Sequence, residues 1–241
     1  MEILFPGLHK CVAVSCYTLK TFNIIFFLFF SNIVFGQVFS YPKLNKSYKQ
    51  VQEFVSPDWT LLDTISGDLN DDKIKDLVAI LEYKDTIAEV RPNGFSIVTN
   101  PRVLLIFFKK SNGSLDLKLQ HNTFLLRNGE DMRYEVYPIL SIKKGVLSIY
   151  YDLFHDYPTY KFRYQNNDFY IIGATVTGIH GGNWSEEDIN FDTKFFYKTS
   201  YYIDNEKNKK VKHLYLKDLQ PLKLMDFKMP LTYKITEDYT L

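Results

Sequence analysis

The sequence predicts a mainly β fold, an α+β variant in which one short N-terminal helix is the only helix. Aromatic residues make up 17% of the 241 residues, with 20 Phe and 18 Tyr against 11 Gly and 9 Pro, which favours pleated sheet over disorder. Apolar and polar residues alternate along several short segments, as in half-buried strands. Turn residues separate these segments closely, so we expect an antiparallel meander that forms a sandwich or a partly closed barrel.

The N-terminal helix is expected at Tyr48–Val55. Ser47 and Gln50 have the spacing of a capping box, and apolar residues then recur on one side of the segment. Ser56-Pro57 ends this pattern, because proline disfavours helical backbone in the residue before it.

Three strands are expected next, each rich in Val, Ile, Leu or Phe and bounded by turn residues: Trp59–Ile65, Asp76–Tyr83 and Arg102–Lys109. Two stretches within them, LVAIL at 77–81 and VLLIFF at 103–108, are apolar on both faces. Strands of this kind are expected in the middle of a sheet, with other parts of the chain packed on each side.

The rest of the chain is expected to form hairpins. Ser111–Ser114 contains Asn-Gly and separates two apolar segments, which predicts a tight antiparallel connection. Similar turn signals follow at 143–145, 165–168 and 204–210. Alternation predicts three sets of residues that share a sheet face: Leu147, Ile149 and Tyr151; Tyr160, Phe162 and Tyr164; and Phe195, Tyr197, Thr199 and Tyr201.

Residues 1–36 are predicted to be a secretory signal peptide. The apolar run Phe22–Phe35 follows Lys20 and precedes the small residue Gly36. It falls short of the roughly 18 to 20 apolar residues that span a bilayer. We therefore expect a secreted or periplasmic bacterial protein with no integral membrane segment after cleavage, and a single β-rich domain over 37–241.

The leader has two further features. Residues 1–18 lengthen the basic segment beyond its usual size, which suggests a start at Leu19; a precursor peptide containing Glu2–Lys10 would contradict that start. Both cysteines, Cys11 and Cys16, precede the cleavage site. The cleaved protein would therefore have no disulfide, no thiolate metal site and no cysteine nucleophile.

The charge balance argues against nucleic acid as a partner. The chain has 29 basic and 28 acidic residues. Cleavage removes Lys10, Lys20 and Glu2, which leaves 29 − 2 = 27 basic and 28 − 1 = 27 acidic residues. No global field would gather a polyanion. The lysines at 207–212 are interpreted as a solvated hairpin tip.

One segment carries recognisable chemistry, GDLNDDKIKDL at 67–77. Counted from its first aspartate, side-chain oxygens fall at positions one, three, five and nine, with a backbone carbonyl at seven. Calcium takes six to eight oxygen ligands at roughly 2.3 to 2.6 Å, and alternate residues of a tight loop can direct them inward. The sequence therefore predicts a calcium site formed by Asp68, Asn70, Asp72, Ile74 and Asp76.

The segment resembles the calcium loop of FG-GAP and VCBS repeats, D-x-[DN]-x-D-G-x-x-D-[LV], which joins two strands of a propeller blade. The resemblance implies the same five ligands and covers Trp59 to about Leu81, in one copy only. Lys73 replaces the usual glycine, where a left-handed backbone costs about 1 to 2 kcal/mol. The order of features also resembles uncharacterised secreted bacterial proteins with a single such loop, which implies export and no activity.

The same loop has a reading without metal. Asp and Asn side chains bond to backbone amides a few residues on, so GDLND at 67–71 would also suit an Asx-turn that enters a strand. An EF-hand fits poorly, because its twelfth position is Ala79 and not a bidentate glutamate.

Two further places hold candidate binding residues. Asp152, His155 and Asp156 lie together, as a polar hairpin loop or as a base with its orienting carboxylate or part of a zinc site. His180 to Trp184 reads as a mobile connection with an exposed Trp, followed by three carboxylates. An aromatic side chain beside carboxylates is also how a sugar or peptide surface begins.

Two functions remain open. The first is a non-catalytic binding module whose calcium loop rigidifies a surface for an unknown protein or glycan of the cell envelope. The alternative is a cell-envelope hydrolase that uses the His155 or His180 loop. The hydrolase predicts that these loops meet in a concave pocket with a carboxylate in reach, whereas the binding module predicts a flat or convex aromatic surface.

Overall fold

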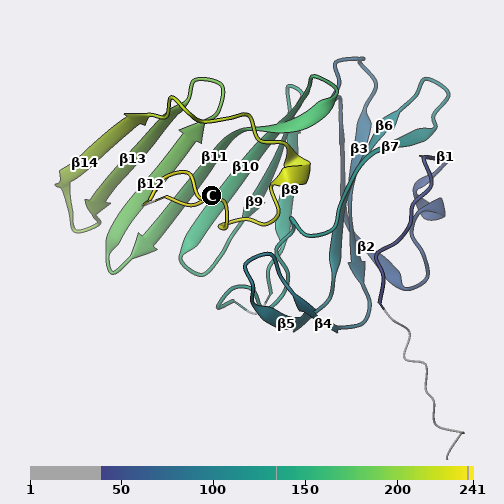
Figure 1. The fold of residues 1–241 in the computed structure, drawn as a ribbon, viewed down its shortest axis with the longest axis horizontal. Helices are drawn as coiled ribbons and strands as arrows, with labels where there is room; N and C mark the ends of the chain where they lie inside the picture. The colour runs from purple at the N-terminus through teal and green to yellow at the C-terminus, as the bar shows by residue number, and fades with distance from the viewer. Residues whose placement is uncertain (1–38, 134, 238) are drawn as a thin grey trace, which may run out of the picture. The chain divides into compact units, whose positions relative to one another are not determined.

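The computed structural model describes residues 39–133, 135–237 and 239–241 (Figure 1). Tyr41–Leu241 form one compact unit. The predicted signal peptide, its cleavage site and both cysteines lie outside the described residues. The fold prediction is confirmed in class: the unit is mainly β, its sheets are antiparallel and they do not close into a barrel.

The first sheet has five antiparallel strands. Its order is β1 (Ser47–Tyr48), β7 (Leu115–His121), β6 (Arg102–Lys109), β3 (Asp76–Tyr83) and β2 (Trp59–Gly67). A separate hairpin pairs β4 (Ile87–Val90) with β5 (Ser96–Thr99). β3 and β6 are central, and all residues of 78–81 and 103–107 are inaccessible to solvent. This confirms the prediction drawn from their continuous apolar sequence.

The second sheet has seven strands in sequence order, the predicted meander. They are β8 (Pro138–Lys143), β9 (Val146–Tyr151), β10 (Asp156–Gln165), β11 (Asp168–His180), β12 (Asn183–Asn190), β13 (Phe195–Tyr202) and β14 (Asn205–Tyr215). Among the described residues no strand pairs with the outer edge of β14, which is exposed along nearly its whole length and carries Lys207, Lys209, Lys210 and Lys212.

The predicted N-terminal helix is much shorter than expected. Tyr48 belongs to β1, and only Val51–Glu53 form a single 3-10 turn, η2. The capping box does not form either, because Ser47 pairs with Asp116 of β7 and its hydroxyl donates to the Asp116 carboxylate at 2.7 Å. The apolar residues of the segment instead cover the five-stranded sheet, and Phe54 stacks on Phe107 at 4.6 Å between ring centroids.

The two sheets meet at their edge strands β2 and β8. Gly67 of β2 lies against Ile142 of β8, so closely that an ideal Cβ at Gly67 would be 2.5 Å from Ile142 Cγ2. Phe108 of β6 packs on Tyr164 of β10 at 4.8 Å between ring centroids. The core between the sheets therefore combines side chains from both, as in a sandwich.

A segment without strands, residues 122–133 and 135–137, fills the space beside the sheets. Phe124 is fully buried against Phe162 and Phe227, at 5.5 and 5.4 Å between ring centroids. The described residues of this segment have backbone carbonyls with no partner in a strand. Three buried arginines donate hydrogen bonds to several of these carbonyls. Arg102 donates to the carbonyls of Leu126 and Val136, Arg91 to those of Thr123 and Leu125, and Arg127 to that of Asn122.

Each buried arginine also has an acidic partner. Arg102 Nε lies 2.7 Å from Glu82 Oε2, and Arg91 Nε lies 2.5 Å from Glu130 Oε1. Arg127 forms an ion pair with Glu89 of β4. These pairs matter because an unpaired charge in the interior is strongly destabilising.

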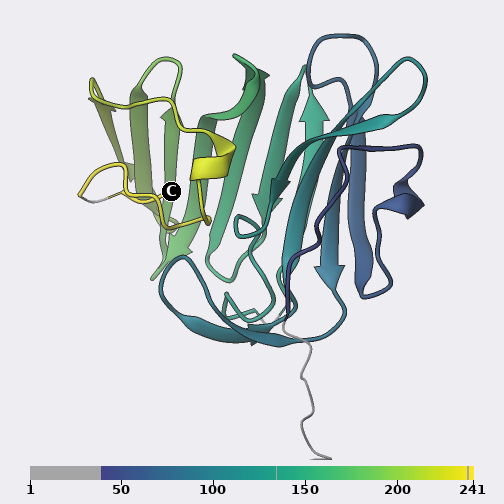
Figure 2. The ribbon, with the colours of Figure 1, turned by 45° about the vertical axis from the view of Figure 1, so that its right-hand side comes forward.

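The C-terminal segment, Leu216–Leu241, covers the inner face of the seven-stranded sheet beyond the five-stranded sheet (Figure 2). Tyr239 packs on Phe196 of β13 at 4.6 Å between ring centroids. The 3-10 turn η3 (Leu224–Asp226) is held at β11, where Ile171 N–H donates to the Leu222 carbonyl at 3.0 Å. The opposite, outer face of β12 to β14 has no such cover among the described residues.

His121 ends β7 in the interior and is only 3% exposed. Its Nδ1 accepts the N–H groups of Thr123 and Phe124 at 3.3 and 3.2 Å, which makes the neutral ring the favoured form. Burial lowers the pKa of His121 to about 4, and the positive charges of Lys228 and Arg91 act in the same direction.

We predict that Gly67→Ala destabilises the protein by about 1 to 3 kcal/mol, the usual cost of overpacking. The new methyl group would overlap Ile142, and the backbone of both edge strands would have to move apart. Urea denaturation measures the effect. The double variant Gly67→Ala/Ile142→Ala should lose less stability than the sum of the single variants, and additive losses would contradict the contact.

We predict that His121 makes the fold sensitive to acid. Its folded pKa of about 4 lies below the usual histidine pKa of 6.5, so its contribution to stability is complete above about pH 6.5 and is lost as the pH falls towards 4. The loss is on the order of 3 kcal/mol. Denaturation at a series of pH values measures it.

The variant His121→Asn keeps an acceptor near the Nδ1 position and cannot take up a proton in this range. It should lose the acid-dependent part of the curve, whereas His213→Asn, at an exposed histidine of β14, should not. An unchanged acid profile in His121→Asn would contradict the assignment.

Candidate functional site

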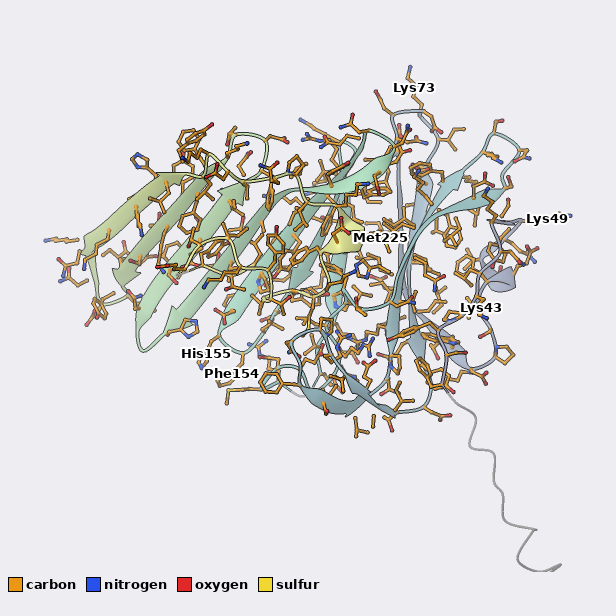
Figure 3. All side chains as sticks on the ribbon, viewed as in Figure 1. Lys43, Lys49, Lys73, Phe154, His155 and Met225 are labelled. Carbon is orange, nitrogen blue, oxygen red and sulfur yellow. The ribbon has the colours of Figure 1, made fainter. Side chains whose placement is uncertain are left out.

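The predicted calcium loop connects β2 to β3. Gly67 and Asp76 are the last paired residues of the two strands, so residues 68–75 form the connection. Figure 3 shows Lys73 of this loop at the opposite end of the sheets from His155. Four of the five predicted ligands thus lie in one short hairpin connection, and the fifth, Asp76, is the first residue of β3.

Backbone amides and side chains within the loop occupy the predicted ligand oxygens. Asp68 accepts the N–H groups of Asp71 and Lys73, both at 2.8 Å. Asn70 Oδ1 accepts Asp72 N–H at 3.1 Å, and Asn70 Nδ2 donates to Asp72 Oδ2 at 3.0 Å. Asp72 Oδ1 accepts the N–H of Ile74 at 2.8 Å. This is the network of Asx-turns that the reading without metal predicts.

Two loop residues have left-handed backbone, Asp71 with φ 64° and Lys73 with φ 67°. The second is the position where the repeat has glycine, so the strain expected from the sequence falls on Lys73. Asp68 offsets part of this cost, because its carboxylate bonds to the Lys73 N–H.

Asp76 differs from the other loop residues, because it is fully buried. Its Oδ2 accepts Leu69 N–H at 2.9 Å and its Oδ1 accepts Lys109 N–H of β6 at 3.0 Å, so one carboxylate fastens the loop to the neighbouring strand. Burial raises the pKa of Asp76; the two amide bonds oppose this, and the nearby charges of Asp72 and Asp68 add to it. A cation beside the loop would relieve the repulsion among these three carboxylates.

The carboxylate and amide oxygens of these residues are of the chemical type that a hard cation binds. Each carboxylate oxygen of Asp68 and Asp76 accepts a single backbone bond, and an ionised carboxylate offers about four lone-pair sites. The loop side chains are not arranged as the ligands of one ion. In the part of the chain that the structure describes, no three His, Cys, Asp or Glu residues form a group that could hold a metal ion. The contact between Asn70 and Asp72 would have to open.

The outer face of the seven-stranded sheet carries an aromatic surface. Strand register places Trp184 beside Tyr201 and Asp188 beside Tyr197 on this face. The rings of Trp184 and Tyr201 are 4.8 Å apart and inclined by 31°. The surface, which we call the aromatic face, comprises Trp184, Glu186, Asp188, Phe195, Tyr197, Thr199, Tyr201, His213 and Tyr215.

Carboxylates and hydroxyls lie among these rings. Thr175 of β11 donates its hydroxyl to Asp188 at 2.6 Å, which fixes one oxygen of this carboxylate on the sheet. Tyr197 and Tyr215 are 44% and 61% exposed, respectively. The sequence predicted that Phe195, Tyr197, Thr199 and Tyr201 share a face, and the register confirms it.

The segment around Trp184 corrects one prediction. His180 to Trp184 was expected as a mobile connection, but Gly181 and Gly182 alone form a tight turn, with φ of 56° and 76°. His180 pairs with Asn183 across it, and Trp184 with the carboxylates after it belongs to β12. Two consecutive glycines between apolar segments are a hairpin signal, which would have revealed the Trp184–Tyr201 register.

The two histidine loops come together, which is one part of what the hydrolase alternative predicts; the other part is a concave pocket. His180 at the end of β11 lies 2.9 Å from Asp156 through Nε2 and Oδ1, and its ring centroid is 5.5 Å from that of His155. His155 lies in the polar connection between β9 and β10. The carboxylate is in reach, but all three residues lie at the surface, and the His180 side chain is 56% exposed.

Comparisons with protein-family models, with curated proteins and with solved structures give no match. The resemblance to FG-GAP and VCBS repeats therefore rests on the loop residues alone. Of the residues described, none lies in a helix with the length and apolar character that crossing a membrane requires.

Proposed function

We propose that the protein is an exported, non-catalytic binding module that contacts a glycan of the cell envelope through its aromatic face. The observation that carries the proposal is the contact between Trp184 and Tyr201 on the outer face of the seven-stranded sheet, in one row with the pairs Glu186–Thr199 and Asp188–Tyr197. Indole and phenol rings pack against apolar faces of a sugar, and carboxylates accept its hydroxyl groups. An extended sheet suits a chain of sugars better than one small molecule, which binds in a concave site.

A structural calcium ion in the loop 68–76 is part of this proposal. The ion would be held by Asp68, Asn70, Asp72, Asp76 and the Ile74 carbonyl. It would neutralise the repulsion among the carboxylates and reinforce the connection from Asp76 to Lys109 of β6. Its role is to stabilise the folded state by linkage.

The alternative of a cell-envelope hydrolase is favoured by one observation, the contact between His180 and Asp156. An acyl-transfer site also needs a nucleophile bonded to the base. Among the described residues, neither His155 nor His180 has a hydrogen bond to a Ser or Thr hydroxyl, so the binding module is better supported. Hydrolysis of envelope glycan or peptide that is lost in His180→Ala would restore the alternative.

We predict that calcium raises the melting temperature of the protein relative to chelator. At a concentration 100 times the Kd, the gain is about 2.7 kcal/mol, which corresponds to several degrees for a chain of this size. Asp68→Ala should abolish the shift, whereas Asp85→Ala, at an exposed aspartate outside the loop, should keep it. Lys73→Gly should raise the affinity, because it removes both the backbone strain and a positive charge. Identical melting temperatures in every condition would exclude the metal.

We predict that Trp184→Ala and Tyr201→Ala each weaken glycan binding about tenfold or more, the loss of roughly 1.4 kcal/mol. A glycan array identifies the best oligosaccharide, and titration calorimetry with it measures Kd. The control is Phe95→Ala, at a ring that is 74% exposed in the β4–β5 turn. Binding of envelope proteins but of no glycan, with loss in the same two variants, would replace the glycan by a protein partner. Unchanged binding in both variants would contradict the aromatic face.

A further inference from the structure

His155, Asp156 and His180 come together where β10 begins and β11 ends. The register of the two strands pairs Asp156 with Gly178, which brings His180 alongside the connection that carries His155. The aromatic face begins close by, because Trp184 pairs with Ile179, the residue before His180, but successive residues of a strand point to opposite faces of the sheet. The acidic loop lies at the other end of the sheets (Figure 3). A ligand here would therefore be independent of the acidic loop.

The spacing of the two imidazoles matches that of a pair bound to one metal ion. A Zn–N distance of about 2.0 to 2.1 Å and a tetrahedral angle place the two ring centroids about 5.2 Å apart. The centroids of His155 and His180 are 5.5 Å apart, with ring planes inclined by 49°. The observed separation of the centroids is therefore close to that of two imidazoles bound to one ion.

Asp156 is placed to orient His180. Its Oδ1 lies 2.9 Å from Nε2 of His180, so that Nδ1 remains for a metal. Imidazole ligands of metals commonly donate their other ring N–H to a carboxylate, which fixes the tautomer and makes the ring a better ligand. The pair thus has the arrangement of a ligand with its orienting group.

Gly178 provides the space in which this pair forms. An ideal Cβ at Gly178 would lie 2.6 Å from Asp156 Oδ1, 3.0 Å from His180 Nε2 and 3.1 Å from the His155 carbonyl oxygen. Any other residue would push the carboxylate and the imidazole apart. The lack of a side chain at this position is therefore a built feature of the cluster, and it gives a way to disturb the cluster without changing a ligand.

We propose that His155 and His180 bind a zinc ion, with Asp156 as the positioning residue of His180. Imidazole is a preferred ligand of zinc and a poor one for calcium, so the site would not compete with the acidic loop. Two protein ligands leave the remaining positions to water or to groups of a partner. The His180 side chain is 56% exposed, so such groups can approach the ion.

The test is calorimetric titration of the purified protein with zinc chloride, in excess calcium to saturate the acidic loop. We expect one zinc ion per chain. His155→Ala and His180→Ala should each weaken binding tenfold or more, and Asp156→Asn should weaken it about 10- to 100-fold, the usual effect of losing an orienting partner. The matched control is Asp85→Asn, at an exposed aspartate outside both candidate sites and the aromatic face, which should leave Kd unchanged.

Gly178→Ala separates this proposal from adventitious binding to surface histidines. It keeps both histidines in the chain, but its methyl group would separate the Asp156 carboxylate from the His180 imidazole, so it should weaken zinc binding as Asp156→Asn does. Circular dichroism of each variant checks that the fold is kept. Zinc binding within twofold of wild type in the double variant His155→Ala/His180→Ala would overturn the proposal, and so would a fully retained affinity in both Gly178→Ala and Asp156→Asn.

Discussion

Three buried guanidinium groups stabilise the segment of the structure that belongs to neither sheet. Arg91, Arg102 and Arg127 supply donors to backbone carbonyls of this segment, residues 122–133 and 135–137. Without these donors, burial of that backbone would leave polar groups unsatisfied. The segment places Phe124 in the core, Phe227 of the C-terminal segment packs on Phe124, and the same C-terminal segment covers the inner face of β11 to β13. The apolar inner face is thereby buried, whereas none of the described residues outside the sheet covers its outer face at β12 to β14.

Periodicity predicted most strands but not which side of the sheet faces the core. Residues 147, 149 and 151, which are predicted to share a face, are buried, whereas the equally regular set from Phe195 to Tyr201 faces outward and Phe196 is the buried residue. When aromatic residues occupy both faces of a strand, the alternation in the sequence does not indicate which face is buried. The cover of the inner face comes from residues 216–241, which have no regular period. The role of the buried arginines could not be predicted for a similar reason. They bond to backbone carbonyls, which no sequence motif marks.

For the candidate sites, too, the sequence predicts some features of the structure and not others. Spacing alone placed four potential ligands in one hairpin connection and a fifth, Asp76, at the start of the next strand. It does not decide between a cation and the loop's own amides, since both use the oxygens of Asp68, Asn70 and Asp72. The meeting of His155 with His180 depends on the register of β10 and β11, which shifts at a bulge between Lys161 and Phe162. That shift leaves no signal in either strand's sequence.

The lysine-bearing edge of β14 bears on how the protein behaves at high concentration. A free edge strand presents unpaired N–H and C=O groups to any second molecule, and fibril growth can start there. When two such edges approach, rows of ammonium groups face one another and repel at separations below the Debye length, about 8 Å at physiological ionic strength. The protein should therefore associate more readily at high salt concentration, where counterions screen the lysines.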